Sequence, residues 1–90
     1  MEIVHVKDQN KWLAVNDEVQ IGELNYAIKD GILTINHTEV DGYYRGNKIA
    51  EDMVLATAEF ARTEDMKIAL ECSFAEKVFE KHPKLKDILA

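Results

Sequence analysis

The chain has 90 residues, 47% of them hydrophobic, so a modest core and one domain over residues 1–90 are expected. Seventeen acidic residues against eleven Lys and Arg give a formal charge of −6, the wrong sign for binding nucleic acid or an anionic membrane. A single cysteine, no basic and apolar leader, and no apolar run of roughly 20 residues predict a cytoplasmic chain without a disulfide or a membrane helix.

The first forty residues follow the pattern of β-strands. Segments rich in Val, Ile, Tyr and Trp alternate with polar breaks, and they predict strands at residues 2–6, 11–15, 19–29 and 31–40. Asp30-Gly31 predicts a tight hairpin between the last two strands, because these residues accept the positive φ angles that such a turn requires. Alternation in the fourth strand predicts that Leu33, Ile35 and His37 share one face.

After Val40 the hydrophobic period changes to that of a helix. Apolar residues recur at i, i+4, i+7 and i+11, namely Ile49, Met53, Ala56 and Phe60. This spacing predicts a helix from about residue 48 to 63, followed by a fifth strand at 66–70. Because a helix separates this strand from the fourth, the expected pairing is parallel through a right-handed crossover.

A second helix is predicted to begin at Ser73. Ser73 and Glu76 have the spacing of a capping box, and Pro83 ends the helix at His82. A short helical turn completes the chain. The predicted fold is therefore α+β, with a mixed sheet of about five strands, two main helices and a C-terminal turn.

Two segments carry candidate chemistry. The loop over residues 41–47 leads from a strand into a helix, where free backbone N–H groups suit an anion; the alternative is a plain connection. Cys72 precedes a helix, which favours a thiolate; the alternative is an inert core thiol, the usual state of a free cysteine. His37, on the strand predicted to adjoin that thiol, is either a base or a structural histidine. The sequence contains no metal-ligand spacing.

The segment from His37 to Ala50 reads His-Thr-Glu-Val-Asp-Gly-Tyr-Tyr-Arg-Gly-Asn-Lys-Ile-Ala. It is followed by the predicted helix and fifth strand, then by Cys72-Ser73-Phe74 and His82-Pro83. In this order and at these distances, the motifs resemble the small, single-domain GNAT-like N-acetyltransferases. The likeness is continuous over residues 32–89, and the first two strands match in pattern alone. The resemblance implies a minimal GNAT-like fold.

In that superfamily a loop of pattern Arg/Gln-x-x-Gly-x-Gly/Ala wraps the pyrophosphate of acetyl-CoA with backbone amides. The pantetheine arm enters where the fourth and fifth strands separate. The resemblance therefore implies acetyl-CoA as the cofactor and puts Cys72 and His37 near the acetyl group. The cofactor-binding residues it implies are Val40, Arg45, Gly46, Asn47, Lys48, Ile49 and Ala50.

The implied activity is acetyl transfer to a small amine or an exposed lysine, directly or through the cysteine, by a monomer or a homodimer. Lys48 stands where the motif has its middle glycine, so its side chain either obstructs the phosphates or pairs with them. Glu51 and Asp52, in the first turn of the helix, are expected to repel a pyrophosphate.

The last helix lacks a match for the tyrosine that protonates the leaving thiolate in larger acetyltransferases. Two other functions therefore compete with catalysis. One is a non-catalytic acyl-CoA-binding module, and the other is a protein-interaction domain that retains only the fold.

Overall fold

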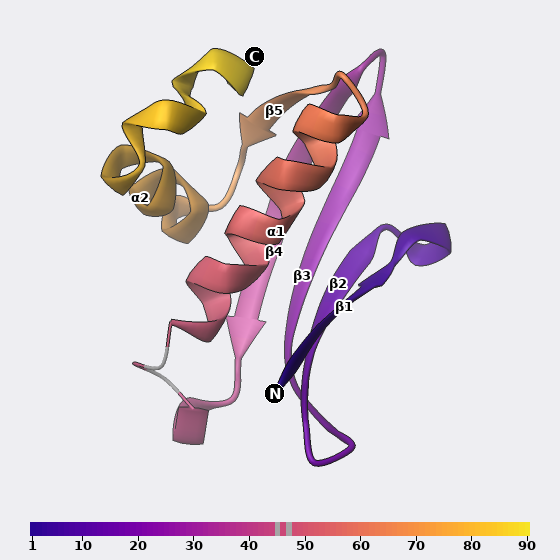
Figure 1. The fold of residues 1–90 in the computed structure, drawn as a ribbon, viewed down its shortest axis with the longest axis vertical. Coiled ribbons are helices and arrows are strands. Elements are labelled where there is room, and N and C mark those ends of the chain that lie inside the picture. Colours follow the sequence, from indigo (N-terminus) through magenta and orange to yellow (C-terminus); the bar gives the residue numbers. More distant parts are fainter. Residues whose placement is uncertain (45, 47) are drawn as a thin grey trace.

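Five strands pair in chain order to form one sheet, and a long helix lies across one face of it (Figure 1). The computed structural model describes residues 1–44, 46 and 48–90. The strands are β1 (Glu2–Val6), β2 (Lys11–Asn16), β3 (Val19–Lys29), β4 (Ile32–Val40) and β5 (Lys67–Leu70). The helices are α1 (Ile49–Thr63) and α2 (Ser73–Lys81), with 3-10 turns η1 (Lys7–Gln9), η2 (Gly42–Tyr44) and η3 (Pro83–Ile88). The predicted α+β architecture is confirmed.

The order of antiparallel and parallel pairing also follows the prediction. Strands β1 to β4 are antiparallel neighbours, and β5 pairs parallel to β4. The β3–β4 turn has φ values of 52° at Asp30 and 78° at Gly31, as the Asp-Gly signal indicates.

The predicted inner face of β4 is wrong at His37. The β3–β4 register pairs Tyr26 with Ile35 but Asn25 with His37, so Asn36 is an extra residue in β4. This bulge interrupts the alternation of side chains. Leu33 and Ile35 are fully buried as predicted, whereas the side chain of His37 is 60% exposed.

The buried stripe of α1 differs slightly from the predicted one. Ile49 and Met53 are buried as expected, and so are Val54 and Ala61, which widen the apolar stripe. Ala56 and Phe60 are only half-buried, and Thr57 is buried in their place. Thr57 fits the apolar core because its hydroxyl donates to the backbone oxygen of Met53 at 2.8 Å.

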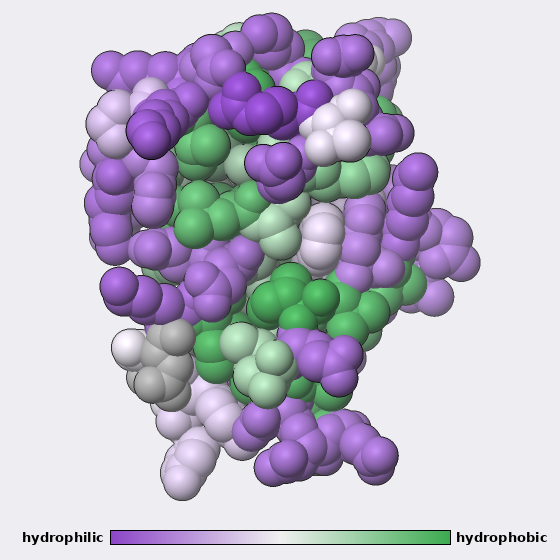
Figure 2. Space-filling model, viewed as in Figure 1, coloured by the Kyte–Doolittle hydropathy of each residue, from purple (hydrophilic) through white to green (hydrophobic). Residues whose placement is uncertain are grey.

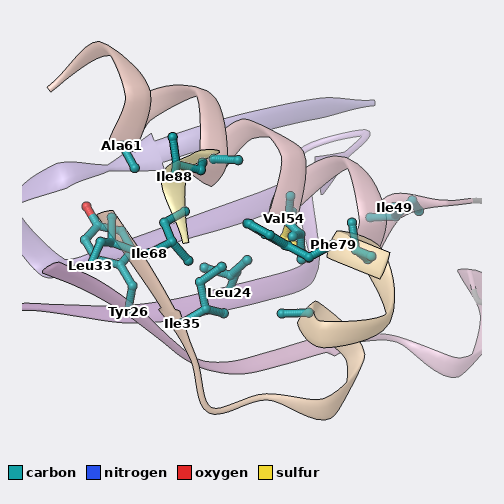
Figure 3. Packing of buried hydrophobic residues seen from close by; sticks show 14 of the residues in the cluster. Leu24, Tyr26, Leu33, Ile35, Ile49, Val54, Ala61, Ile68, Phe79 and Ile88 are labelled. Atoms are coloured by element: carbon teal, nitrogen blue, oxygen red, sulfur yellow. The ribbon is translucent and has the colours of Figure 1, made fainter. Parts of the chain in front are cut away.

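The core lies between α1, α2 and the sheet. Figure 3 shows Val54 and Ile49 of α1 beside Phe79 of α2, with Leu24 and Ile35 of the sheet nearby. Residues from every main element after β1 therefore contribute to one cluster.

The end of the chain covers the outer edge of β5. Leu89 forms a parallel bridge with Ile68, and the amide of Ala90 donates to the Ile68 oxygen at 2.8 Å. The guanidinium of Arg62 holds η3 in place through two bonds to Asp87, at 2.6 and 3.0 Å.

Hydrophilic side chains cover most of the face that carries α1, and hydrophobic groups show between them (Figure 2). No helix in the described part of the chain has the length and apolarity needed to cross a membrane.

Gly22 lies in a tightly packed place between the sheet and Met53 of α1, and it gives a first prediction. A Cβ there would lie 3.1 Å from the Glu39 oxygen, 3.2 Å from Met53 Cε and 3.3 Å from Ala14 Cβ. The Met53 side chain can move, but the Glu39 oxygen belongs to the paired strand. We expect Gly22→Ala to lower the free energy of unfolding by about 1 to 3 kcal/mol.

Gly42→Ala is the control, because nothing lies within 4 Å of a Cβ at that position. Chemical denaturation of both variants measures the difference. Equal stability of the two variants would contradict the tight packing inferred at Gly22.

Candidate functional site

A cleft begins where β4 and β5 separate. The two strands pair only from Ile32 with Lys67 to Ile35 with Leu70, and the last backbone bond joins the Glu71 amide to the Ile35 oxygen at 3.0 Å. Beyond this point β4 runs on to Val40, while the other chain turns into α2. Within the described residues, no strand pairs with this edge of β4 after Ile35.

The separation leaves a cavity of about 780 Å³ between β4, the start of α1 and one face of α2. Consecutive residues of β4 line it because the cavity runs along the edge of the strand. Its apolar wall consists of Val40, Tyr44, Ile49, Ala50, Phe74 and Val78. Its polar side chains are His37, Thr38, Glu39, Lys48, Glu51, Lys77 and Lys81.

The predicted cofactor residues that the structure describes all line this cavity, namely Val40, Gly46, Lys48, Ile49 and Ala50. Arg45 and Asn47 lie outside the described residues. Gly46 has a φ of 88°, and Lys48 has a φ of 61°. Because the Lys48 side chain is exposed, it does not fill the cavity.

The start of α1 presents positive charge to the cavity. Lys48 occupies the N-cap position, and no side chain caps the helix there. The first N–H groups of a helix have no partner inside it, and they form the positive end of its dipole. Lys77 of α2 adds an ammonium group to the same cavity. This arrangement suits an anion such as a phosphate.

Glu51 places a carboxylate among the cations at this end of the cavity. Its side chain is only 14% exposed, and it accepts a bond from Lys81 Nζ at 2.9 Å, with His82 Nε2 at 3.6 Å. The bond from Lys81 lowers the pKa of Glu51, so the carboxylate is ionised at neutral pH. Because Lys81 is the last residue of α2 and His82 follows it directly, Glu51 links two walls of the cavity.

Cys72 occupies the N-cap position of α2, which corrects the predicted capping box. Ser73 is the first residue of the helix, and no side-chain cap forms; the Glu76 amide bonds to the Cys72 oxygen at 3.1 Å. The Ser-x-x-Glu spacing is present, but the helix begins one residue too early for Ser73 to cap it.

The Cys72 thiol is half-buried and lies 3.6 Å from the Thr38 hydroxyl, to which it donates. Burial raises the pKa of the thiol, but the amides of Ala75 and Phe74 and the contacts with Thr38 outweigh burial. The net pKa of Cys72 is lowered from 9.0. The sequence-based expectation that this position favours a thiolate agrees with this direction.

His37 and Cys72 lie on different sides of β4. Thr38 contacts the thiol, and its neighbour His37 points to the opposite face, as successive strand residues do. His37 Nε2 lies 3.5 Å from a carboxylate oxygen of Glu39. Among the described residues, no hydrogen bond or ion pair joins His37 to Cys72, and only His37 lines the cavity.

Thr38 and the charged face of α2 were not predicted as parts of the site. Phe74, Lys77, Val78 and Lys81 recur at i, i+3, i+4 and i+7, the pattern that puts side chains on one face of a helix. This spacing could have indicated that both lysines face one site.

Within the described chain, no group of three ligating side chains forms a metal site.

Structural comparison finds similar folds among acetyltransferases. A GCN5-like protein from Staphylococcus aureus, solved by NMR, has a TM-score of 0.77 and 26% identity over 99% of this chain and 87% of that one. The aminoglycoside N-acetyltransferase AAC(6')-Iy in complex with CoA has a TM-score of 0.64 and 18% identity, over 79% of this chain and 63% of the other.

Sequence comparison gives a consistent result. Protein NATD1 of Gallus gallus is 36% identical over 52 residues, which are 58% of this chain and 47% of that protein. NATD1 of Homo sapiens matches to the same extent, over 46% of its length. This chain thus matches about half the length of these curated relatives. The model of the GCN5-related N-acetyl-transferase family matches residues 11–88, and the chain therefore belongs to this family.

Proposed function

We propose that the protein is an acetyl-CoA-dependent N-acetyltransferase that acts on a small amine or an exposed lysine. One observation carries the proposal: the β4–β5 separation opens an apolar cavity along a free strand edge, and the cavity has a positive mouth. Membership of the GCN5-related N-acetyl-transferase family supports acetyl transfer as the chemistry of this cavity.

The cavity fits a long, partly apolar cofactor that ends in phosphates. Near Val40, the backbone N–H and C=O groups of β4 can bond to the amide groups of the cofactor, in the way that they would bond to an added strand. Lys48, Lys77 and the start of α1 suit the phosphates, and Ile49 and Ala50 flank them. A structural neighbour in complex with CoA supports this choice. Arg45, Gly46 and Asn47 complete the proposed loop.

Acetyl-CoA would supply an acetyl group activated as a thioester. His37 is the proposed base, because its imidazole lines the cavity yet remains 60% exposed, so an acceptor amine can reach it from solvent. A carboxylate oxygen of Glu39 lies 3.5 Å from His37 Nε2 and can orient the imidazole toward the amine.

Cys72 has two candidate roles in this proposal. As a nucleophile, its thiolate would attack the thioester carbonyl and release CoA as its thiol, and the amine would then take the acetyl group and free the cysteine; the lowered pKa of Cys72 favours this thiolate. As a packing group it would fix Thr38, which lines the cavity.

A non-catalytic acyl-CoA-binding module is the second candidate. The observation that favours it is the face of α2 toward the cavity, where the described residues include Phe74 and Val78 but no tyrosine to protonate a leaving thiolate.

Binding and turnover test the proposal directly. Acetyl-CoA at about 100 times its Kd is expected to stabilise the protein by about 2.7 kcal/mol, measured as a rise in Tm. Free CoA should then appear by chromatography when small amines or a lysine-containing peptide are added. Binding without release would identify a binding module, and the absence of both would leave an interaction domain.

Lys77→Met is expected to weaken acetyl-CoA binding about two- to fivefold in calorimetric titration, because it removes a cation from the cavity mouth. Lys84→Met is the matched control, since Lys84 is an exposed lysine on η3 outside the cavity. Equal weakening in the two variants would point to net charge rather than to a phosphate contact.

Thr38→Val removes the hydroxyl beside Cys72 and preserves its shape. Because Thr38 lowers the pKa of the thiol, its loss should move the pH profile of Cys72 alkylation to higher pH. Thr34→Val, on the same strand, should leave the profile unchanged. Coincident profiles for the two variants would show that Thr38 does not stabilise the thiolate.

A further inference from the structure

The wall of the cavity carries its own anion. Glu51, in the first turn of α1, lines the cavity together with Lys81, and their 2.9 Å ion pair spans from α1 to α2. The side chain of Lys81 is 64% exposed, whereas that of Glu51 is 14% exposed. The lysine is thus free to turn toward solvent, while the carboxylate is fixed in the wall.

Lys77 and Lys81 are one helical turn apart and face the same cavity. Lys81 is paired with Glu51, whereas Lys77 forms no ion pair within the described part of the chain. Two cations of similar position therefore differ in how available they are to an anionic ligand.

We propose that Glu51 is an internal counterion that holds Lys81 and competes with the phosphates of CoA for it. This inference rests on the function proposed above. Glu51 occupies Lys81 in the ligand-free protein, and it also presents a fixed negative charge to an incoming phosphate. Glu51 thereby weakens cofactor binding and stabilises the contact between α1 and α2.

The largely buried position of Glu51 explains why this carboxylate weakens the binding of a phosphate. A carboxylate that is 14% exposed is screened by solvent and salt less than a surface group, so its repulsion of a phosphate persists within the cavity. His82, 3.6 Å away, remains as a second partner for Glu51 when Lys81 turns to the ligand. Lys81 can therefore exchange partners without leaving the carboxylate isolated.

Asp52 provides the matched control. It is the adjacent residue in the same helical turn and carries the same charge, but it is exposed and does not line the cavity. Glu51→Gln and Asp52→Asn thus change the net charge and the helix terminus equally. Only Glu51→Gln releases Lys81.

The experiment is calorimetric titration of the full chain with CoA. We expect Glu51→Gln to bind CoA about three- to fivefold more tightly than wild type, the scale of one partly screened charge, while Asp52→Asn changes Kd less than twofold. In thermal denaturation without ligand, Glu51→Gln should have the lower Tm, because it loses the link to α2. A purely structural role predicts only this second effect.

A double-mutant cycle with Lys81→Met tests the exchange itself. Lys81→Met alone should weaken CoA binding slightly, because Glu51 then loses the lysine that neutralises it. In the Glu51→Gln background, Lys81→Met should remove the part of the gain in affinity that comes from the freed lysine. Unchanged or weaker CoA binding by Glu51→Gln, with wild type binding normally, would overturn this inference alone. Failure of every variant to bind CoA would overturn the proposed function together with it.

Discussion

The site depends on one limit to backbone pairing: β4 and β5 share a parallel ladder only as far as Ile35. A bulge at Asn36 follows directly, and the chain after β5 turns into α2 within three residues of Leu70. Strand β4 thus continues to Val40 with β3 still paired on one side, while the backbone groups of its other edge face a cavity. The core described above supports this opening, because α1 and α2 pack against each other at Phe79 and Val54 and hold the walls apart.

Most of the fold could be predicted from the sequence, because local signals specify it. The Asp30-Gly31 turn, the helical period after Lys48 and the helix between the two parallel strands each follow from residue type and spacing. The face of His37 could not be predicted in this way. The bulge depends on how β3 and β4 align over their whole length, and no residue in the sequence marks it.

The candidate site was predicted less completely. The loop residues Val40, Lys48 and Ala50 were found through resemblance, and they line the cavity. The contacts that tune the site join residues distant in sequence: Thr38 with Cys72, and Glu51 with Lys81. Glu51 was expected to act as a simple repulsive charge. Its pairing with Lys81 depends on the packing of α1 against α2, which spacing along one helix does not reveal.

The short bridge between Leu89 and Ile68 has a practical consequence for handling the protein. Any group attached beside Leu89 would lie next to β5, the strand whose departure from β4 opens the cavity. A group attached beside β1 would lie at the opposite edge of the sheet, with β2 and β3 between it and β4.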